Sequence, residues 1–354
     1  MTPKSLIVLA AATAVAVGAA AVSLQANRKD ADISMSGTVF PGLIDRVNDA
    51  AKVTIEHRDR SLTMVRDAKG KWTMKESDDY PVSAKVAEKV VVQMADLNYY
   101  ELKTRKADLY TRLHVGDPKA EKAEAREIKL YDQDGKVMAE VIAGRKRYNL
   151  VGARREGVYI RKPGKPQTWL AAGEFDVEVK PGDWLERKIV DIDENNVLST
   201  TLVHPDGEVV RISKENPQER NFTLHDIPAG KKLQYDTDPD NIAGVVDQLE
   251  LDDARKDGYV TFDAEKTLKA EFVTRDGLKL EIEMRAKDGS DWARVKAAAL
   301  PDAPAPKDGA KSAADRAQEI NARVSGWVYA LPGFKATRLK RRMADMLKDD
   351  KPAS

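Results

Sequence analysis

The chain contains no cysteine. Without a thiol it cannot form a disulfide, a thiolate nucleophile, an iron–sulfur ligand or a lipid-modified cysteine. A chain of 39.2 kDa can still bury enough apolar surface in one or two domains to fold without disulfides. The absence therefore excludes several kinds of chemistry, but it does not exclude export from the cytoplasm.

Neither sign of charge dominates the sequence. There are 59 lysines and arginines and 58 aspartates and glutamates, which gives a net charge of +1. Proteins that bind nucleic acid usually carry a clear excess of positive charge. The balance predicts that nucleic acid is not a partner.

Motifs for catalysis and for cofactor binding are also missing. The sequence has no Gly-x-Gly-x-x-Gly, no Walker-type lysine loop and no Gly-x-Ser-x-Gly. The four histidines (His57, His114, His204, His225) lack the spacing of metal ligands, and we interpret them as structural. The stretch from Asp236 to Asp240 begins like a calcium loop, but glycine is missing at its sixth position and glutamate at its twelfth. We therefore predict no enzyme activity, no catalytic residue, no cofactor and no metal. A hydrolase that uses paired carboxylates remains the alternative.

One long hydrophobic run stands out at the N-terminus. The nineteen residues from Leu6 to Leu24 carry no charge, and Lys4 precedes them as in a secretory signal. About 20 apolar residues in a helix cross the hydrocarbon core of a bilayer, whereas cleaved signal cores run to only about 7–15 residues. We predict that residues 1–29 are an uncleaved single-pass anchor in a bacterial inner membrane, with the large C-terminal domain in the periplasm. A secreted periplasmic protein, released by cleavage near Ala21, is the alternative.

Short alternating strands and turns begin after the anchor. Residues 53–57 alternate in polarity, the turn from Asp67 to Gly70 separates two further strands, and Ser83 opens an amphipathic helix. A second hairpin follows around Gly135. We assign residues 38–192 to a first α+β unit with the order hairpin, helix, hairpin.

Residues 193–300 repeat this order. His204 follows His57 by 147 residues, and the turn glycine Gly277 follows Gly135 by 142. Offsets that drift by a few residues are typical of an internal duplication with loop insertions. The predicted fold is therefore α+β, with two tandem hairpin–helix–hairpin units and mainly antiparallel sheets. The alternative is that similar hairpins occur in any α+β chain.

The C-terminal region has a different composition. Residues 301–314 contain three prolines and are predicted to be an extended linker, followed by a helical basic tail over residues 315–354. In this tail, cationic residues are interleaved with apolar ones, a pattern typical of helices that lie on an anionic membrane or dock a partner. A terminal helix that covers the sheet is the alternative. The candidate contact residues are Lys335, Arg338, Lys340, Arg341, Arg342 and the preceding Trp327.

Several short motifs resemble a known family. They are Trp72-Thr-Met, the stretch from Asp183 to Asp191 (DWLERKIVD) and the stretch from Gly326 to Lys335 (GWVYALPGFK). Together with the anchor and the doubled units, they are similar to the bacterial family named domain of unknown function 4340. The resemblance implies an envelope protein with one N-terminal membrane segment, similar to the auxiliary subunits of gliding-motility-type ABC transporters. It implies no catalytic residue.

These observations lead to one expected function and two alternatives. We expect a membrane-anchored periplasmic binding or scaffold module, accessory to an ABC-type envelope transport complex, with membrane lipid and transporter subunits as partners. The alternatives are a carboxylate-dependent envelope hydrolase and a structural protein that docks on anionic membrane through its basic tail.

Overall fold

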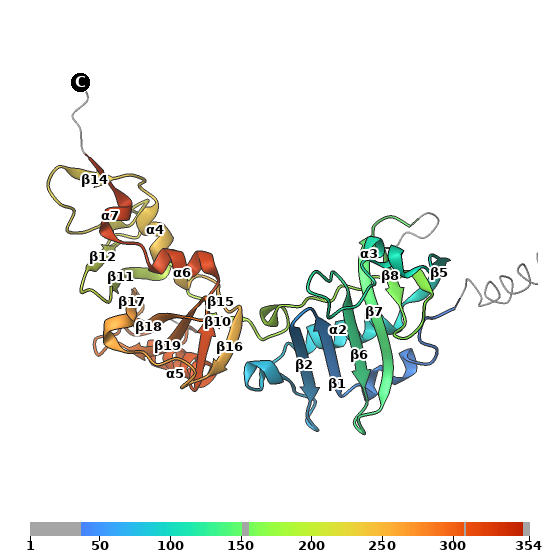
Figure 1. The fold of residues 1–354 in the computed structure, drawn as a ribbon. Helices are drawn as coiled ribbons and strands as arrows, with labels where there is room; N and C mark the ends of the chain where they lie inside the picture. Colours follow the sequence, from blue (N-terminus) through green and yellow to red (C-terminus); the bar gives the residue numbers. More distant parts are fainter. Residues whose placement is uncertain (1–36, 151–155, 308, 350–354) are drawn as a thin grey trace, which may run out of the picture. The chain divides into compact units, whose positions relative to one another are not determined.

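The computed structural model describes residues 37–150, 156–307 and 309–349, and the chain divides into two compact units (Figure 1). Unit 1 contains the described residues up to Lys69 and Ala84–Val177. Unit 2 contains Gly70–Ser83 and the described residues from Glu178 onward. The structure confirms a mixed α+β fold with mainly antiparallel sheets and few helices.

Unit 1 is built on an antiparallel sheet with the strand order β2-β1-β6-β7-β8-β9-β5. The strands are β1 (Lys52–His57), β2 (Arg60–Arg66), β5 (Asn98–Leu102), β6 (Arg126–Tyr131), β7 (Val137–Arg147), β8 (Gly157–Arg161) and β9 (Thr168–Ala172). The short helical elements are η1 (Ile44–Asp49), α2 (Ala84–Ala95), η3 (Ala107–Leu109) and α3 (Tyr110–Leu113). Strict alternation in β1 buries Val53 and Ile55 and leaves Thr54 and Glu56 partly exposed, as a half-buried strand requires.

Two apolar clusters hold unit 1 together. The apolar face of α2 buries Val90 and Met94, as its helical periodicity predicts. A smaller cluster beside α3 joins Val115, Ile142 and Tyr159, and Leu113 packs against it. The second cluster holds α3 near the end of the unit that carries β5.

Unit 2 contains an antiparallel sheet with the order β13-β12-β11-β17-β18-β19-β20-β16. Its strands are β11 (Val197–Val203), β12 (Val209–Ser213), β13 (Thr223–Leu224), β16 (Asp253–Lys256), β17 (Leu268–Thr274), β18 (Leu278–Lys287), β19 (Ser290–Ala299) and β20 (Trp327–Ala330). Two small sheets pair β10 (Lys188–Val190) with β15 (Leu249–Glu250), and β14 (Lys231–Leu233) with β21 (Leu347–Asp349). The helices are α4 (Asp238–Ala243), α5 (Ala313–Val324), α6 (Gly333–Leu339) and α7 (Met343–Met346), with 3-10 turns η4 (Pro181–Asp183), η5 (Glu194–Asn196), η6 (Gly244–Val246) and η7 (Ala264–Lys266).

A segment from early in the chain belongs to unit 2. Gly70–Ser83 forms β3 (Trp72–Met74), η2 (Lys75–Ser77) and β4 (Tyr80–Pro81). The Ser77 hydroxyl donates to Asp253 over 2.7 Å, and the ring of Tyr80 lies edge-on to Trp327 with centroids 4.8 Å apart. This segment and residues 178–192 therefore pack with unit 2.

Corresponding strands in the two units follow the same order. In each unit a first hairpin (β1–β2 or β11–β12) is joined at its first strand by a later hairpin (β6–β7 or β17–β18). A strand that follows the helix, β5 directly after α2 and β16 after α4 and β15, pairs at the opposite end of the main sheet of its unit. The matched turn glycines Gly135 and Gly277 have φ values of +76° and +81°, which glycine adopts at low cost.

The C-terminal region, predicted to be a helical basic tail over residues 315–354, contains strands as well as helices. The helix α5 ends at Val324, because Gly326 with φ +82° turns the chain into β20, which contains Trp327. Pro332 precedes α6, and the extended backbone of Arg342 separates α6 from α7. The described part of the tail therefore consists of α5, the two short helices α6 and α7, and the two strands β20 and β21, all within unit 2.

Two further expectations concern helices. Asp238 followed by proline predicts the start of a helix whose apolar positions run to Leu249. The helix α4 ends at Ala243 and Leu249 begins a strand, so the predicted helix is too long. Within the part of the chain that the structure describes, no helix is both long and apolar enough to span a bilayer. The predicted anchor from Leu6 to Leu24 lies outside the described residues.

Candidate functional site

A large concavity lies in unit 2, on the polar face of the sheet. We call it the unit 2 groove; its volume is about 810 Å³. The side chains that line it come from β11, β17, β18 and β19, and α5 forms one wall. The groove is lined by Thr201, Val203, Asp257, Lys269, Ala270, Glu271, Glu281, Ile282, Glu283, Arg294, Val295, Lys296, Asn321, Val324, Ser325, Gly326 and Trp327.

Strand register sets the pattern of charge on this face. Directly opposed residues across β17, β18 and β19 form two rows, Lys269–Glu283–Arg294 on one level and Glu271–Glu281–Lys296 on the next. Other residues of these strands, such as Phe272 and Leu280, belong to the buried core. Period-two alternation thus separates an apolar core face from a polar groove face.

Ion pairs neutralise most of the acids in the groove. Arg294 lies 2.6 Å from Glu283, and Lys279, beside the groove, lies 2.6 Å from Glu281 and 3.4 Å from Glu271. The hydrogen bond from Lys279 lowers the pKa of Glu281. A general acid requires the opposite shift, so Glu281 is arranged for an ion pair and not for proton donation.

Two lysines of the groove differ from the ion-paired residues described above. Lys269 and Lys296 are exposed and form no ion pair with any residue that the structure describes. They lie at opposite ends of the charged rows, on β17 and β19. The groove therefore offers a partner both free cations and paired carboxylates.

The helix α5 is fixed beside the groove by one side chain. The amide of Asn321 accepts a hydrogen bond from the backbone N–H of Ala297 over 2.9 Å and donates to its carbonyl over 2.7 Å. This pair of bonds replaces a neighbouring strand along that part of β19. Asn321 therefore both closes a sheet edge and positions the wall of the groove.

One carboxylate in unit 1 has a raised pKa. Burial, followed by a hydrogen bond with Glu140, raises the pKa of Glu127, and Lys129 lies 2.9 Å from Glu140. These side chains lie on β6 and β7. They do not line either of the two pockets at the β5 edge of the unit 1 sheet. A raised pKa alone does not define an active site.

The predicted contact residues of the tail are mostly engaged within unit 2. Lys335 is 5% exposed, and its ammonium donates to the carbonyls of Gly244, Val245 and Asp247 over 3.1, 3.0 and 2.6 Å. In this conformation its charge does not reach a partner surface. Burial lowers the pKa of Lys335.

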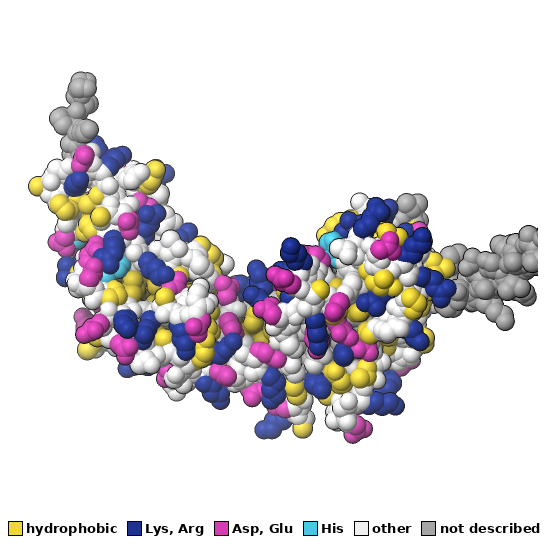
Figure 2. Space-filling view, in the orientation of Figure 1, with side chains coloured by type: hydrophobic (Ala, Val, Ile, Leu, Met, Phe, Trp, Pro, Cys, Tyr) yellow, Lys and Arg dark blue, Asp and Glu magenta, His cyan; other side chains and the backbone are white. Residues whose placement is uncertain are grey.

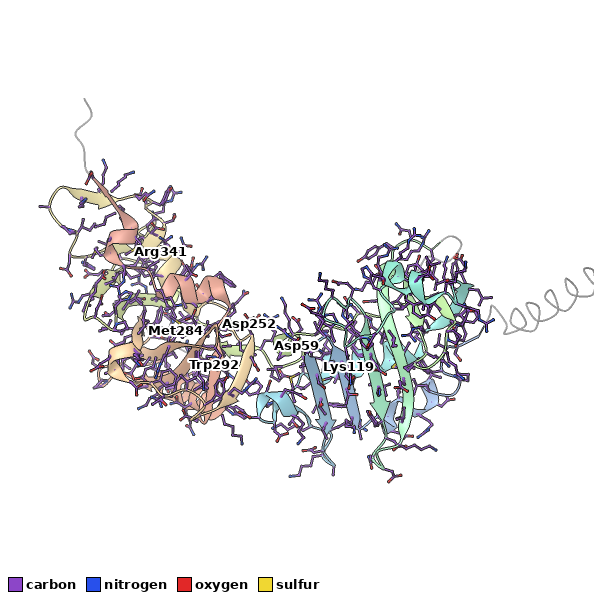
Figure 3. All side chains as sticks on the ribbon, in the orientation of Figure 1. Asp59, Lys119, Asp252, Met284, Trp292 and Arg341 are labelled. Carbon is purple, nitrogen blue, oxygen red and sulfur yellow. The ribbon has the colours of Figure 1, made fainter. Side chains whose placement is uncertain are left out.

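The other tail cations lie closer to the surface. Lys340 is 2.5 Å from Asp291, Arg342 pairs with Asp206 at 2.8 Å, and Arg338 stacks over the ring of Phe334. Arg341 lies between α6 and α7 (Figure 3), and its carbonyl is 3.1 Å from His204. Contact of these residues with a membrane stays a prediction.

Three of the histidines, His57, His204 and His225, have hydrogen-bonding partners within their units. His57 is 2.9 Å from the carbonyl of Ala125, and His225 is 2.7 Å from the Ser213 hydroxyl. His114 has φ +58° at the end of α3. Among the described residues, no cluster of histidine and acidic side chains is placed to hold a metal ion.

The sequence pattern contained part of the groove. Residues 267–274 and 278–284 flank the predicted turn at Gly277, and the structure makes them the strands β17 and β18, with alternating burial. The groove itself depends on α5, which returns to β19 after the linker. No local pattern predicts that return.

Taken together, the fold and the groove define a two-unit α+β protein with a charged concave surface on an antiparallel sheet. A family model described as a domain of unknown function (DUF4340) matches residues 72–272, which is more than half of the chain. The chain therefore belongs to this family. No curated protein and no solved structure matched the chain.

Proposed function

We propose that the protein is a binding or scaffold module, held at the bacterial inner membrane by the run from Leu6 to Leu24, that serves an ABC-type envelope transport complex. Family membership is compatible with this role, and the hydrophobic run supports the tether. The observation that carries the proposal is the unit 2 groove, a large charged concavity built on a rigid sheet.

The groove suits a polypeptide partner with charges of both signs. Four carboxylates and three cations line it, so a partner of a single charge would meet repulsion as well as attraction. Lys269 and Lys296 are free to pair with partner carboxylates. Complementary charges at such a surface contribute mainly to specificity and to the rate of association.

The two units support the predicted duplication. Their corresponding strand orders, and the matched positions of Gly135 and Gly277, are what a duplicated unit would leave. The groove lies in the second unit. Two pockets in the first unit, at the β5 edge of its sheet, have a different pattern of charged side chains. We propose that the two copies contact different components at the membrane.

The proposal is tested by pull-down of the full chain from detergent extracts. The test variant is Lys269→Glu with Lys296→Glu, and the matched control is Lys180→Glu with Lys266→Glu, which changes two exposed lysines outside the groove by the same charge. We expect the wild type and the control to recover permease or ATPase subunits and the test variant to recover much less. Equal recovery by both variants would exclude the groove as the contact, and recovery of cytosolic proteins alone would contradict the proposed role.

A further inference from the structure

Unit 1 carries two adjoining pockets at the β5 edge of its sheet. Their volumes are about 640 and 220 Å³, and Leu102 of β5 lines both. We call them the β5 pockets. The larger is lined by Leu102, Lys103, Thr104, Leu109, Arg112, Leu113, His114 and Arg145, and the smaller by Tyr99, Leu102, Arg105, Lys162, Lys165, Pro166, Gln167 and Trp169.

Charge in the β5 pockets has one sign. Six lysines and arginines line the two pockets, and none of the described lining residues is acidic. Lys103 is paired with Glu101 at 2.5 Å, whereas Arg112 and Lys165 form no ion pair with any residue that the structure describes. Lysine and arginine side chains gather over the end of unit 1 that carries α3, β5 and β8 (Figure 2). This concentration contrasts with the net charge of +1 for the whole chain.

The pockets also present apolar surface. Leu102, Leu109 and Leu113 line the larger one, and in the smaller one the rings of Tyr99 and Trp169 pack with centroids 4.5 Å apart. Cations beside leucines and aromatic rings match a ligand that has an anionic group next to an apolar region. A free inorganic anion would use only the cations.

The chain enters unit 1 at the same edge of the sheet. Thr38 forms a bridge with Asn98 of β5, and the backbone N–H of Val39 donates to the carbonyl of Leu97 over 2.8 Å. The ammonium of Lys162, which lines the smaller pocket, donates to the carbonyl of Val39 over 3.1 Å. Thirteen residues separate Leu24 from Thr38, and even fully extended they reach at most about 45 Å. A bilayer that holds the hydrophobic run is therefore always within reach of this edge.

We infer that the β5 pockets dock unit 1 on the anionic phospholipid headgroups of the bilayer in which the chain is tethered. The inference rests on the tether of the proposed function and goes beyond it by assigning the membrane-facing surface. Each lysine or arginine near an anionic surface strengthens binding by about 1 kcal/mol, which is about five-fold. Removing the charges of Arg112 and Lys165 should therefore weaken docking roughly 30-fold.

The absence of cysteine allows a site-specific test. The full chain carries Ala107→Cys, an exposed position in η3 beside the larger pocket, labelled with a fluorophore. It is reconstituted in vesicles of phosphatidylcholine alone or with added phosphatidylglycerol, and quenching by lipid-borne spin label is measured. A label at Ser61→Cys, an exposed position on β2, which lies five strands away from β9, the neighbour of β5, reports whether quenching is specific to the β5 edge.

Variants that each remove two positive charges test whether the β5 pockets are the docking surface. We expect phosphatidylglycerol to increase quenching at position 107 and not at position 61. Arg112→Gln with Lys165→Gln should abolish the increase, and the matched control, Lys85→Gln with Lys136→Gln, should keep it, since those exposed lysines lie outside the pockets. Quenching that ignores phosphatidylglycerol, or an increase that survives in the test variant, would overturn the inference.

Two further arms separate the possible failures. Loss of the increase on addition of inorganic phosphate at constant ionic strength would show a free-anion site and would also overturn the inference. If the chain does not float with vesicles of either composition, the tether fails, and with it the inference that rests on it. If it floats with both and position 107 is never quenched, only the docking surface is wrong.

Discussion

Lys335 lies in a sequence pattern that is typical of a surface helix, but its side chain is buried in unit 2. Its position in a basic amphipathic stretch predicts exposure, yet its ammonium satisfies three carbonyls at the end of η6. Cations commonly stabilise the last carbonyls of a helical segment in this way. The sequence could not show this, because the carbonyl acceptors lie about 90 positions earlier in the chain.

Replacing Lys335 with methionine should destabilise unit 2. The change keeps most of the side-chain volume but leaves three carbonyls without their donor, and each unsatisfied buried group costs about 1–3 kcal/mol. We expect a loss of about 2–4 kcal/mol in the free energy of unfolding, measured by urea titration with tryptophan fluorescence. Lys266→Met, at an exposed position, is the control and should change stability by less than about 0.5 kcal/mol. Equal behaviour of the two variants would exclude the capping role.

Asp276 links three segments of unit 2 through one carboxylate. It accepts hydrogen bonds from Asn196 over 3.1 Å, from the Thr274 hydroxyl and from Arg316 of α5. Burial opposes ionisation, but these hydrogen bonds and the charge of Arg316 outweigh it and lower the pKa of Asp276. The sequence predicted the turn at Gly277, and it gave no sign of the link to α5.

The stability of the Asp276 link should depend on pH. A carboxyl with a lowered folded-state pKa contributes stability above its unfolded value of about 3.9, and this contribution is lost as the pH falls through the lower folded value. We expect Asp276→Asn to cost about 1–2 kcal/mol at pH 7 and progressively less below pH 4. Thermal unfolding of both proteins across this range measures the difference. A difference that stays constant with pH would mean that the charge of Asp276 is not involved.

At the scale of elements, local patterns predicted the hairpins and α2 well. Strict alternation in β1 and the spacing of Val90 and Met94 in α2 depend on near neighbours, which the sequence shows directly. The helix after Asp238 was predicted too long, because Gly244 follows its sixth residue and favours the 3-10 turn. Residues from Trp327 to Ala330 were assigned to a helical stretch, but pairing with β16 and β19 makes them a strand.

The hydrogen bonds that join α5 to β19 can be tested by replacing Asn321. Asn321→Leu removes both hydrogen bonds to Ala297 and leaves its backbone groups without partners. We expect a loss of about 2–3 kcal/mol and faster hydrogen exchange across α5. The control is Gln318→Leu, an exposed position on the same helix. Unchanged exchange in α5 of the Asn321 variant would show that other contacts hold the wall of the groove.

At the scale of the whole molecule, the division into units was not evident from the chain order. The β3–β4 segment lies between β2 and α2 in sequence, yet it packs in unit 2 through Ser77 and Tyr80. Likewise, β5 pairs with β9 across about 70 residues. Such pairings depend on how distant surfaces fit, which composition and periodicity do not contain. Matched turns and strands do repeat along the sequence, and for that reason the duplication could be proposed from the sequence.

The integration of the C-terminal region gives the last prediction. Deleting residues 335–354 removes Leu339 and Met346, both fully buried, as well as the capping ammonium of Lys335 and the β21 partner of β14. Burial of such side chains contributes about 1.5–3 kcal/mol each, so we expect a loss of at least about 5 kcal/mol. That is comparable with the whole stability of many domains. Unit 2 should therefore lose cooperative unfolding and become sensitive to protease.

Deletion of residues 350–354 alone is the control for this truncation, since it leaves every buried residue named above in place. A truncated chain that unfolds with the same midpoint as the control would contradict the integration. If the truncated chain is destabilised as expected, it cannot be used to test whether the basic tail binds lipid. Deletion of this tail would alter membrane binding through misfolding, so its contact with lipid must be tested with charge variants of surface residues such as Arg338, which leave the buried residues in place.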